Sequence, residues 1–572
     1  MSEKGMGRRD FLKAAALSGV TLGTAGMLAG CASKEQGAAA PSGAAAGEGV
    51  TWDKEANVVV VGSGTGAFAA LAAKKLGAES VVLLEKGNMW GGTAATSGGG
   101  MAIPLTDVAK AAGVEDSMEE VLEYFKNASE GRANPAVLES FATNGNGFLN
   151  WLLETTGWQC NPSPLFGDYY EPLAGWKPMG RGSLGFAKGE TPITAAEMWT
   201  DLQAALEEAG VEIMMETPAT QLVTDSTGAV GGVKATSGKD EVAVKADAVI
   251  LATGGFDHDD EMRAKHMPFK ILATNAALTN TGDGHKMGMA IGADVSFMDS
   301  CWGAPAILTT GQDPHELIES GTIAQEIAGT DWAMYRGLPG AVVVNRKGHR
   351  IGNEATAYDS FFRAFSYYDN GEMEHLNIPS FLVCDAACWN TYSMPGHTVG
   401  SMDGGFFDET YGGGEDGGEV PAWFVQADTL EELAEKLGID PAGLAAEIAA
   451  FNENAEKGVD PVYHRGEKHL DVYTSGVMAG SRTDLANPVL APLATPPFYG
   501  AVYVPGTCGT GGGLTINENA QVMSAFGEPI PGLYAAGNCS SGVAGYWAGG
   551  ATLGQGSVMA YVAAKHITGT AD

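Results

Sequence analysis

The sequence predicts an α/β fold in which helices flank a parallel sheet and a second domain of mixed α+β character is inserted. Apolar runs that indicate buried strands alternate with helical segments in the first half of the chain, and several of these runs end in glycine-rich turns. Aromatic residues, loops and short strands replace this pattern from about residue 296, and glycine-rich turns return from about residue 488. A chain of 572 residues is also too long for one compact core, so two domains are expected.

The first strand and helix carry the pattern of a dinucleotide site. The apolar run Val58–Val61 leads into Gly62–Ala67, which has the order Gly-x-Gly-x-x-Ala. A second apolar run, Val81–Leu84, ends at Glu85. Glycine lets such a turn bring backbone amides against a pyrophosphate at a helix N-terminus, and an acid about 20 positions later can bind the ribose. An ordinary glycine-rich turn is the alternative. Further glycines lie in Gly91–Gly100, and since a plain NAD-binding fold does not need them, a flavin along a second backbone-lined channel is expected.

The remaining elements are predicted from the spacing of apolar residues. Helices are expected over 116–131, 136–155, 194–209 and 286–291, with paired helices over 429–454 that break at Asp440-Pro441. Strands are expected over 211–215, 242–252 and 341–345. The strand 242–252 leads into a second glycine turn, Thr253–Phe256, which could close on the cofactor. Asp283 could cap the helix 286–291 or lie near the flavin, and the sequence leaves both possibilities open.

Glycine-rich segments at the far end of the chain are expected to rejoin the cofactor sheet. They are Gly509–Leu514, Gly532–Asn538 and Gly549–Gly554. The segment between the two glycine-rich regions is therefore an insertion in the nucleotide-binding domain. The expected organisation is a signal over 1–31, a tether over 32–52, a cofactor-binding domain over 53–295 and 488–572, and a cap that forms the substrate side over 296–487.

The N-terminus has the features of an exported lipoprotein. Arg8-Arg9-Asp10-Phe11-Leu12-Lys13 precedes a mildly apolar segment, which is typical of a twin-arginine export signal. Leu28-Ala29-Gly30-Cys31 looks like a bacterial lipobox, so Cys31 is expected to carry the lipid and to anchor the protein at the outer face of the cytoplasmic membrane. A basic amphipathic tail is the alternative. The formal net charge of −36 argues against nucleic acid and against broad adhesion to anionic lipid, so membrane contact is expected through the anchor alone.

The remaining cysteines do not form a recognisable framework. They are Cys160, Cys301, Cys384, Cys388, Cys508 and Cys539. Cys384 and Cys388 lie four positions apart, but no histidine follows as a haem-attachment motif requires. Buried thiols are therefore expected, and no metal site is predicted.

Taken together, these segments resemble flavoproteins of the soluble fumarate reductase and 3-ketosteroid dehydrogenase superfamily. The resemblance covers Val58–Gly100, Ala252–Phe256, Thr281–Gly284, Arg346–Asp359 and Pro496 to the C-terminus. It implies FAD as the cofactor, bound by a Rossmann-like domain with an inserted cap. The candidate FAD-binding residues are Gly62, Gly64, Thr65, Gly66, Ala67, Glu85, Lys86, Gly91, Gly92, Thr93, Ser97, Gly98, Gly99, Thr253, Gly254, Gly255, Asp283, Gly537, Asn538, Thr552 and Leu553.

Three positions argue against the dicarboxylate branch of this superfamily. In that branch an arginine that acts as the acid follows an Arg-Phe-x-x-Glu segment. At the corresponding position this chain has Tyr358. The histidine and arginine that grip carboxylates in that branch correspond here to Gly509 and Ala548. A site without these cations would bury a dicarboxylate's charges unpaired, at a cost of several kcal/mol. Fumarate is therefore not an expected substrate.

The ketosteroid branch is more similar. Matching segments are Asp168–Glu171, Asn353-Glu354 followed by Tyr358, and Tyr546–Gly550. The resemblance assigns proton exchange at the carbon alpha to the ketone to Tyr358, helped by Tyr169 or Tyr170. It assigns polarisation of the ketone to the Tyr546 hydroxyl and the Gly550 amide. One donor placed at a developing oxyanion contributes about 3–4 kcal/mol, and tyrosine, with a pKa of about 10, donates protons at neutral pH. Packed tyrosines without a chemical role are the alternative.

The expected activity is FAD-dependent oxidation or reduction of a CH–CH bond next to a ketone, in a steroid-like or other cyclic substrate. An exported enzyme has no NAD(P)H pool, so a separate membrane-linked donor or acceptor is expected to exchange the electrons. This location favours reduction of an enone in anaerobic respiration, while desaturation of a ketone stays open. A lipoprotein that binds a ligand, or relays electrons through FAD, is the alternative from another class.

Overall fold

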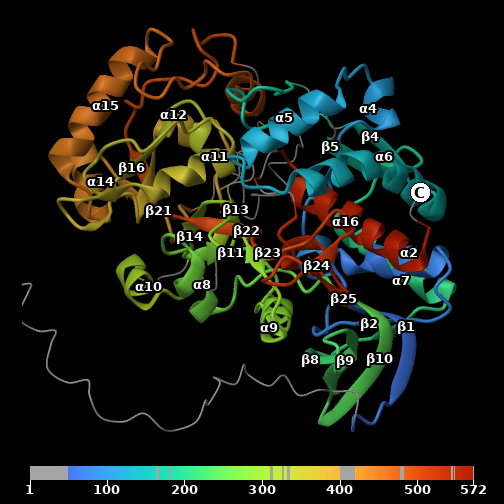
Figure 1. The fold of residues 1–572 in the computed structure, drawn as a ribbon. Helices are drawn as coiled ribbons and strands as arrows, with labels where there is room; N and C mark the ends of the chain where they lie inside the picture. The colour runs from blue at the N-terminus through green and yellow to red at the C-terminus, as the bar shows by residue number, and fades with distance from the viewer. Residues whose placement is uncertain are drawn as a thin grey trace, which may run out of the picture. The chain divides into compact units, whose positions relative to one another are not determined.

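The central sheet combines strands from both ends of the chain (Figure 1). Its strands are β1 (Lys54–Val61), β2 (Val81–Leu84), β7 (Glu212–Met214), β8 (Ala219–Thr224), β9 (Val230–Ser237), β10 (Asp240–Leu251), β24 (Gln521–Met523) and β25 (Pro529–Ala535). They lie in the order β24-β25-β10-β1-β2-β7, and all neighbours from β25 to β7 are parallel. β9 pairs antiparallel with the first half of β10, and β8 pairs with β9. The predicted α/β fold is confirmed.

The computed structural model describes residues 49–162, 167–178, 181, 183–309, 313–324, 327–330, 335–397, 399, 419–476, 482–542, 545 and 548–570. All of them lie in the unit Ala45–Asp572, one of two units into which the chain divides. The expected signal over 1–31 and nearly all of the tether lie outside the described residues, as does Tyr546. The export signal and the lipid anchor therefore stay predictions.

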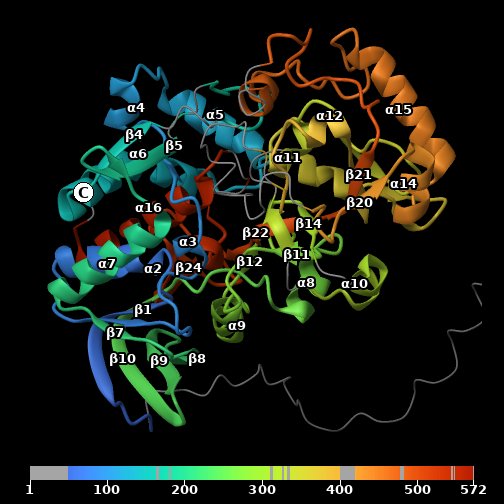
Figure 2. The same ribbon diagram turned by 180° about the vertical axis from the view of Figure 1, so that it is seen from behind.

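Alanine and glycine allow the first helix to pack closely on the central sheet. Helix α2 (Gly66–Lys75) contacts β1 and β2, and its residues from Gly66 to Ala73 are all buried. It also contacts α7 (Ala195–Ala209) and α16 (Ala551–Thr568), as Figure 2 shows from behind. The last helix of the chain thus completes the layer that the first helix begins.

Further helices precede the expected cap in the chain. They are α3 (Gly92–Ala95), α4 (Asp107–Ala111), α5 (Met118–Ala128), α6 (Pro135–Thr156), α8 (Asp260–His266) and α9 (Asp283–Ala290). The predicted helices 116–131, 136–155, 194–209 and 286–291 are confirmed with shifted ends. Among the described residues, no helix is long and apolar enough to cross a membrane.

A second sheet forms the core of the expected cap. Its strands are β14 (Ala306–Leu308), β15 (Ile327–Thr330), β16 (Ala341–Asn345), β19 (Ser380–Asp385), β20 (Val425–Ala427) and β21 (Phe498–Val504). Helices α10 (Pro314–Ser320), α11 (Tyr358–Phe362), α12 (Ala386–Trp389), α14 (Leu430–Leu437) and α15 (Pro441–Ala455) belong to the same part of the chain. The predicted strand 341–345 and the paired helices are confirmed, with Asp440 as the N-cap of α15.

One strand of the cap sheet comes from the segment expected to rejoin the cofactor domain. β21 pairs antiparallel with β19 and β14, although residue 488 was the expected start of the second cofactor-binding part. If the cap is defined by this sheet, its last strand ends at Val504. The division into a cofactor domain and an inserted cap stays a proposal.

Several short sheets complete the fold. They contain β11 (Ala273–Thr274), β13 (Cys301–Gly303) and β22 (Gly506–Thr510), the pair β12 (Val295–Ser296) and β23 (Gly513–Leu514), the pair β17 (Tyr368–Asp369) and β18 (Glu374–His375), and a sheet of β3 (Met101–Ala102), β4 (Gln159–Pro162), β5 (Ser183–Lys188) and β6 (Thr191–Pro192). β13 lies antiparallel to β22, as β14 does to β21. The chain therefore enters and leaves the cap sheet as two antiparallel neighbours.

Candidate active site

The first glycine turn packs against the end of β10. Gly62 has φ +101°, and a Cβ atom there would lie 2.2 Å from the carbonyl oxygen of Ala252. A larger residue would therefore push the turn away from β10. A Cβ atom on Gly64 would lie 3.6 Å from the carbonyl oxygen of Gly91. The glycines thus bring three separate segments into contact at the end of the sheet.

The predicted ribose acid is bound to the glycine turns. Glu85 is buried, and its Oε2 accepts hydrogen bonds from the Ser63 amide at 2.9 Å and the Ser63 hydroxyl at 2.5 Å. Its Oε1 accepts from the Gly87 amide at 2.6 Å. The Ser63 hydroxyl also accepts from the Gly91 amide at 2.8 Å. Because a carboxylate has about four lone-pair positions, Glu85 retains acceptor capacity for a ribose. Sequence reasoning missed Ser63, although a hydroxyl between two glycines was a usable signal.

Residues from the far end of the chain meet this turn. A Cβ atom on Gly537 would lie 2.5 Å from the Thr65 hydroxyl, and one on Gly550 would lie 2.6 Å from the carbonyl oxygen of Gly100. The Gly550 carbonyl accepts a hydrogen bond from the Ala102 amide at 2.9 Å. The separated glycine segments predicted to contact one cofactor therefore lie side by side.

The other candidate cofactor residues lie on the same group of segments. Gly66 and Ala67 begin α2, and Thr552 and Leu553 are in the first turn of α16. Thr93 accepts hydrogen bonds from the Ala277 amide and the Asn280 side chain, Thr253 accepts from the Gly284 amide, Ser97 accepts from the Gly99 amide, and Asn538 accepts from Trp302. A Cβ on Gly254 would meet Asn280 and one on Gly255 would meet Thr510, whereas the described atoms leave open space beside Gly92 and Gly98.

Asp283 does not cap a helix through its side chain. Gly282 is the N-cap of α9, and Asp283 is the first residue of the helix. Its carboxylate binds Lys86 Nζ at 2.7 Å and accepts from the Thr281 hydroxyl at 2.9 Å. Of the two possibilities that the sequence left open, side-chain capping is therefore wrong. The structure brings Lys86 and Asp283 together as an ion pair.

Helix N-termini supply further donors for an anionic cofactor. Among the described α-helices, α2, α3, α9, α11 and α16 begin without a hydrogen bond to a capping side chain. The others are capped by serine, threonine, aspartate or asparagine. The first amides of a helix have no partner within the helix, and the helix dipole favours an anion there. Of these helices, α2, α3 and α16 begin at the glycine turns, so their N-termini fit the two phosphates of a dinucleotide, whereas in α9 the Gly284 amide already donates to the Thr253 hydroxyl.

Two tyrosines form a buried hydroxyl pair in the expected substrate site. The Tyr169 hydroxyl donates a hydrogen bond to the Tyr358 hydroxyl at 3.0 Å, and the two rings meet edge to face at 5.4 Å. Both side chains are buried. Burial raises the pKa of Tyr169 above its ordinary value, so its hydroxyl is protonated at neutral pH. The Tyr358 hydroxyl therefore has a second protonated hydroxyl, that of Tyr169, within hydrogen-bond distance.

The neighbouring tyrosine has a different partner. The Tyr170 hydroxyl donates to Asp359 Oδ2 at 2.5 Å. Of the two tyrosines that the sequence could not separate, Tyr169 is thus the one that contacts Tyr358. Sequence reasoning missed Asp359, although its position directly after Tyr358 was a signal.

A buried ion pair anchors the loop that carries both tyrosines. Asp168 accepts hydrogen bonds from Arg181 Nε and from the Lys177 amide, each at 3.0 Å. Burial raises the pKa of Asp168 to about 6, although Arg181 opposes this shift. The Tyr124 hydroxyl accepts from the Tyr170 amide at 3.2 Å, and Arg181 lies over the Tyr124 ring at 4.8 Å. These contacts fix the loop next to α5.

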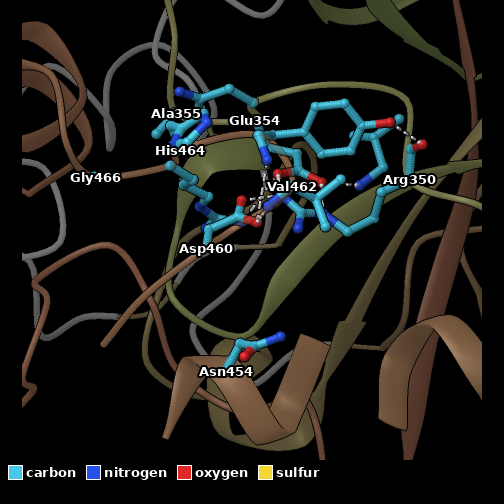
Figure 3. A network of polar contacts seen from close by, with 12 residues as sticks. Arg350, Glu354, Ala355, Asn454, Asp460, Val462, His464 and Gly466 are labelled. Carbon is cyan, nitrogen blue, oxygen red and sulfur yellow. Dashed lines mark hydrogen bonds and ion pairs between the residues drawn. The ribbon is translucent and has the colours of Figure 1, made fainter. Parts of the chain in front are cut away.

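A network of charged residues fixes the segment that precedes Tyr358 (Figure 3). Arg350 donates to both oxygens of Glu354, at 2.7 and 2.6 Å, and to Asp460 at 2.8 Å. Arg465 donates to Glu354 at 3.3 Å and to two backbone carbonyl oxygens at 2.8 Å. All four side chains are buried. These ion pairs therefore hold residues 350–354, which lie four to eight positions before Tyr358 in the chain.

Two residues were expected to donate hydrogen bonds to the ketone oxygen of the substrate. Tyr546, the expected partner of the ketone oxygen, lies outside the described residues. Gly550, the second expected donor, is the N-cap of α16 with φ +83°. Within the described ranges, no group of three or more histidine, cysteine, aspartate or glutamate side chains is arranged to hold a metal ion.

Several known proteins are similar to this chain. The profile of the family described as "FAD binding domain" matches residues 57–553, which include the glycine turns and the tyrosine pair. The chain is 31% identical to a 4-oxocyclohexanecarboxylate 2-dehydrogenase of Sinomonas cyclohexanicum, over 90% of this chain and 93% of that protein. It is also 31% identical to a 3-oxosteroid 1-dehydrogenase of Mycobacterium tuberculosis, over 90% of this chain and 98% of that protein.

A solved structure shows the same architecture. The 3-ketosteroid delta1-dehydrogenase from Sterolibacterium denitrificans, in complex with 1,4-androstadiene-3,17-dione, superposes with a TM-score of 0.78 at 27% identity. The likeness covers 91% of this chain and 100% of that one. The likeness is therefore to the architecture as a whole, with the central sheet and the cap included.

Proposed function

The chain belongs to the FAD-binding domain family, and from this premise we propose that it reduces the C=C bond of an enone in a cyclic, steroid-like or smaller ketone. It is an FAD-dependent oxidoreductase of CH–CH bonds, related to dehydrogenases of cyclic ketones and ketosteroids. Bound FAD supplies or accepts the hydride at the carbon beta to the ketone. The chain's own residues must supply the proton at the alpha carbon and stabilise charge on the ketone oxygen.

The Tyr169–Tyr358 hydroxyl pair is the observation that carries the proposal. Tyr358 transfers its proton to the alpha carbon, and the hydrogen bond from Tyr169 stabilises the phenolate that forms. In the reverse direction the same hydrogen bond lowers the cost of using Tyr358 as the base. The Gly550 amide and the Tyr546 hydroxyl are the proposed donors to the ketone oxygen, where each would stabilise an enolate-like transition state.

A specific observation favours desaturation as a second candidate. Both curated relatives described above are named as dehydrogenases, and the similar solved structure contains a dienone. The site chemistry allows both directions, so the electron partner decides between them. We propose reduction because an exported enzyme would use a membrane-linked electron donor. Export by the twin-arginine route and anchoring at Cys31 are part of this proposal, supported by Arg8-Arg9 and the lipobox-like Leu28–Cys31.

Rapid mixing of the reduced holoenzyme with cyclohex-2-enone tests the proposal. We expect enone to reoxidise the flavin of the wild-type protein, and Tyr358→Phe to slow this step by about 10²–10⁴-fold because the proton donor is lost. The control is Tyr534→Phe, which removes a tyrosine hydroxyl that contacts His566 at 2.9 Å, outside the tyrosine site. Full-speed reoxidation in Tyr358→Phe would refute the assigned chemistry. Reduction of the oxidised flavin by cyclohexanone, with no reoxidation by the enone, would establish desaturation instead.

A further inference from the structure

Two neighbouring residues of the tyrosine loop each bind one of two neighbouring residues at the start of α11. Tyr169 contacts Tyr358 through its hydroxyl at 3.0 Å, and Tyr170 contacts Asp359 at 2.5 Å. The loop 167–178 and the start of α11 are thus joined by two neighbouring hydrogen bonds. The first bond is part of the proposed proton transfer, whereas the second has no role in it.

Asp359 ties a third segment to this pair. Its Oδ1 accepts a hydrogen bond from the Gly303 amide at 3.0 Å, and Gly303 ends β13, the strand that leads into the cap sheet. The side chain of Asp359 is buried, and each of its two carboxylate oxygens accepts one of these hydrogen bonds. One carboxyl group therefore joins the tyrosine loop, the helix that begins at Tyr358 and the entry to the cap.

Charged and titratable groups surround Asp359 without replacing its two donors. Burial raises the pKa of Asp359, and the positive charge of Arg363 opposes this shift. Arg363 lies over the Tyr170 ring at 5.4 Å and binds Glu130 at 2.9 Å on the surface. Cys301 and Cys508 are the neighbouring thiols on β13 and β22, and burial raises the pKa of both.

Loss of either hydrogen bond of Asp359 should displace Tyr358. A buried oxygen without a donor is unfavourable, so the adjacent chain shifts to find a new partner. A displacement of about 1 Å at a reacting group can cost about 10²-fold in rate. Tyr358 and Asp359 share a peptide bond, so a shift at one is transmitted to the other.

We propose that Asp359 is a positioning residue, whose hydrogen bonds with Tyr170 and Gly303 hold the hydroxyls of Tyr169 and Tyr358 in contact. This inference rests on the proposed function, in which Tyr358 exchanges a proton with the substrate. Asp359 itself exchanges no proton with the substrate. Its effect is on the geometry of the proton donor and hence on the catalytic rate.

Three variants of the FAD-loaded protein test the proposal. Asp359→Ala removes both contacts, Asp359→Asn keeps one acceptor oxygen, and Tyr170→Phe removes a single donor but retains the ring beneath Arg363. Turnover of cyclohex-2-enone is measured together with the exchange of the alpha protons of cyclohexanone in D2O, which reports proton transfer without hydride transfer. Tyr534→Phe is again the control for loss of a tyrosine hydroxyl.

We expect Asp359→Ala to lower kcat and the exchange rate together by about 100-fold. Asp359→Asn should retain several times more activity than Asp359→Ala, and Tyr170→Phe should lose about tenfold. KM should stay within about threefold of the wild-type value in each, because a positioning effect acts mainly on the transition state. If Asp359→Ala does not fold, Tyr170→Phe decides, since it retains the carboxylate.

Two results would overturn the inference. Asp359→Ala and Tyr170→Phe enzymes that match Tyr534→Phe in kcat would show that the contacts do not position the pair. A rise in KM at unchanged kcat would show a role in substrate binding instead. Failure of the proposed function is recognised separately, because it requires a Tyr358→Phe enzyme with wild-type kcat.

Discussion

Replacing Glu354 with glutamine removes a buried charge that two arginines share. Arg350 would keep Asp460 at 2.8 Å, so most of the loss falls on Arg465, whose other hydrogen bonds go to backbone carbonyl oxygens. Removing one partner of a buried ion pair costs about 3–5 kcal/mol. Since one of the two guanidinium groups retains a carboxylate, we expect Glu354→Gln to lower the free energy of unfolding by about this amount and not by twice as much.

Urea unfolding of the FAD-loaded protein, followed by circular dichroism, measures this free energy. The matched control is Glu372→Gln in the same part of the chain, which breaks a pair with Lys347 at 3.1 Å whose two side chains are about half exposed. Exposed pairs contribute less than about 1 kcal/mol. The reasoning is refuted if both variants unfold at the same urea concentration with the same slope. Asp460→Asn should be intermediate, because Arg350 would then retain Glu354.

Three further outcomes are expected. Gly62→Ala should abolish FAD binding, seen as loss of the flavin absorbance of the purified protein, because its Cβ would lie 2.2 Å from a carbonyl oxygen; Gly77→Ala, at a positive φ with open space, should keep its FAD. Burial raises the pKa of Asp168 to about 6 from 3.8, so the folded state favours the protonated carboxyl group. The stability that this preference contributes is present below pH 3.8 and lost as the pH rises to about 6. The unfolding free energy of the wild type relative to Asp168→Asn should thus fall by about 3 kcal/mol over that window. Burial lowers the pKa of His285 to about 4 from 6.5, so the folded state favours the neutral imidazole. The stability that this preference contributes is present above pH 6.5 and lost as the pH falls to about 4. Wild type relative to His285→Gln should accordingly lose about 3 kcal/mol on acidification, and a constant difference in either comparison would contradict the burial argument.

The cofactor half of the fold could be predicted because its signals are local. Each strand of the first βαβ unit is a short apolar run, and glycine marks the turn where the backbone needs a positive φ. The strand over 81–84 and the strand over 341–345 were predicted with the bounds that the structure shows. Composition and glycine spacing also predicted that the far end of the chain returns to the same sheet, which the parallel pairing of β10 with β25 confirms.

Pairings between distant segments could not be predicted in this way. β21 has no property that distinguishes a strand of the cap sheet from a strand of the cofactor sheet, because both are buried and apolar. The choice of Tyr169 over Tyr170 depends on which side chain points toward α11, and two adjacent tyrosines in a loop carry no periodicity. The contact of Glu85 with Ser63 likewise depends on a rotamer that the sequence does not specify.

The order of strands in the central sheet has a consequence for synthesis of the protein. β25 and α16 are among the last elements to leave the ribosome, yet β25 lies directly beside β10 and α16 packs on α2. A nascent chain that ends before Pro529 therefore has an open edge at β10, and long-range closure of this kind is slow. Until translation ends, that edge is free for wrong partners. The edge closes only when β25 pairs with β10, so the central sheet cannot be completed before the last part of the chain has been made.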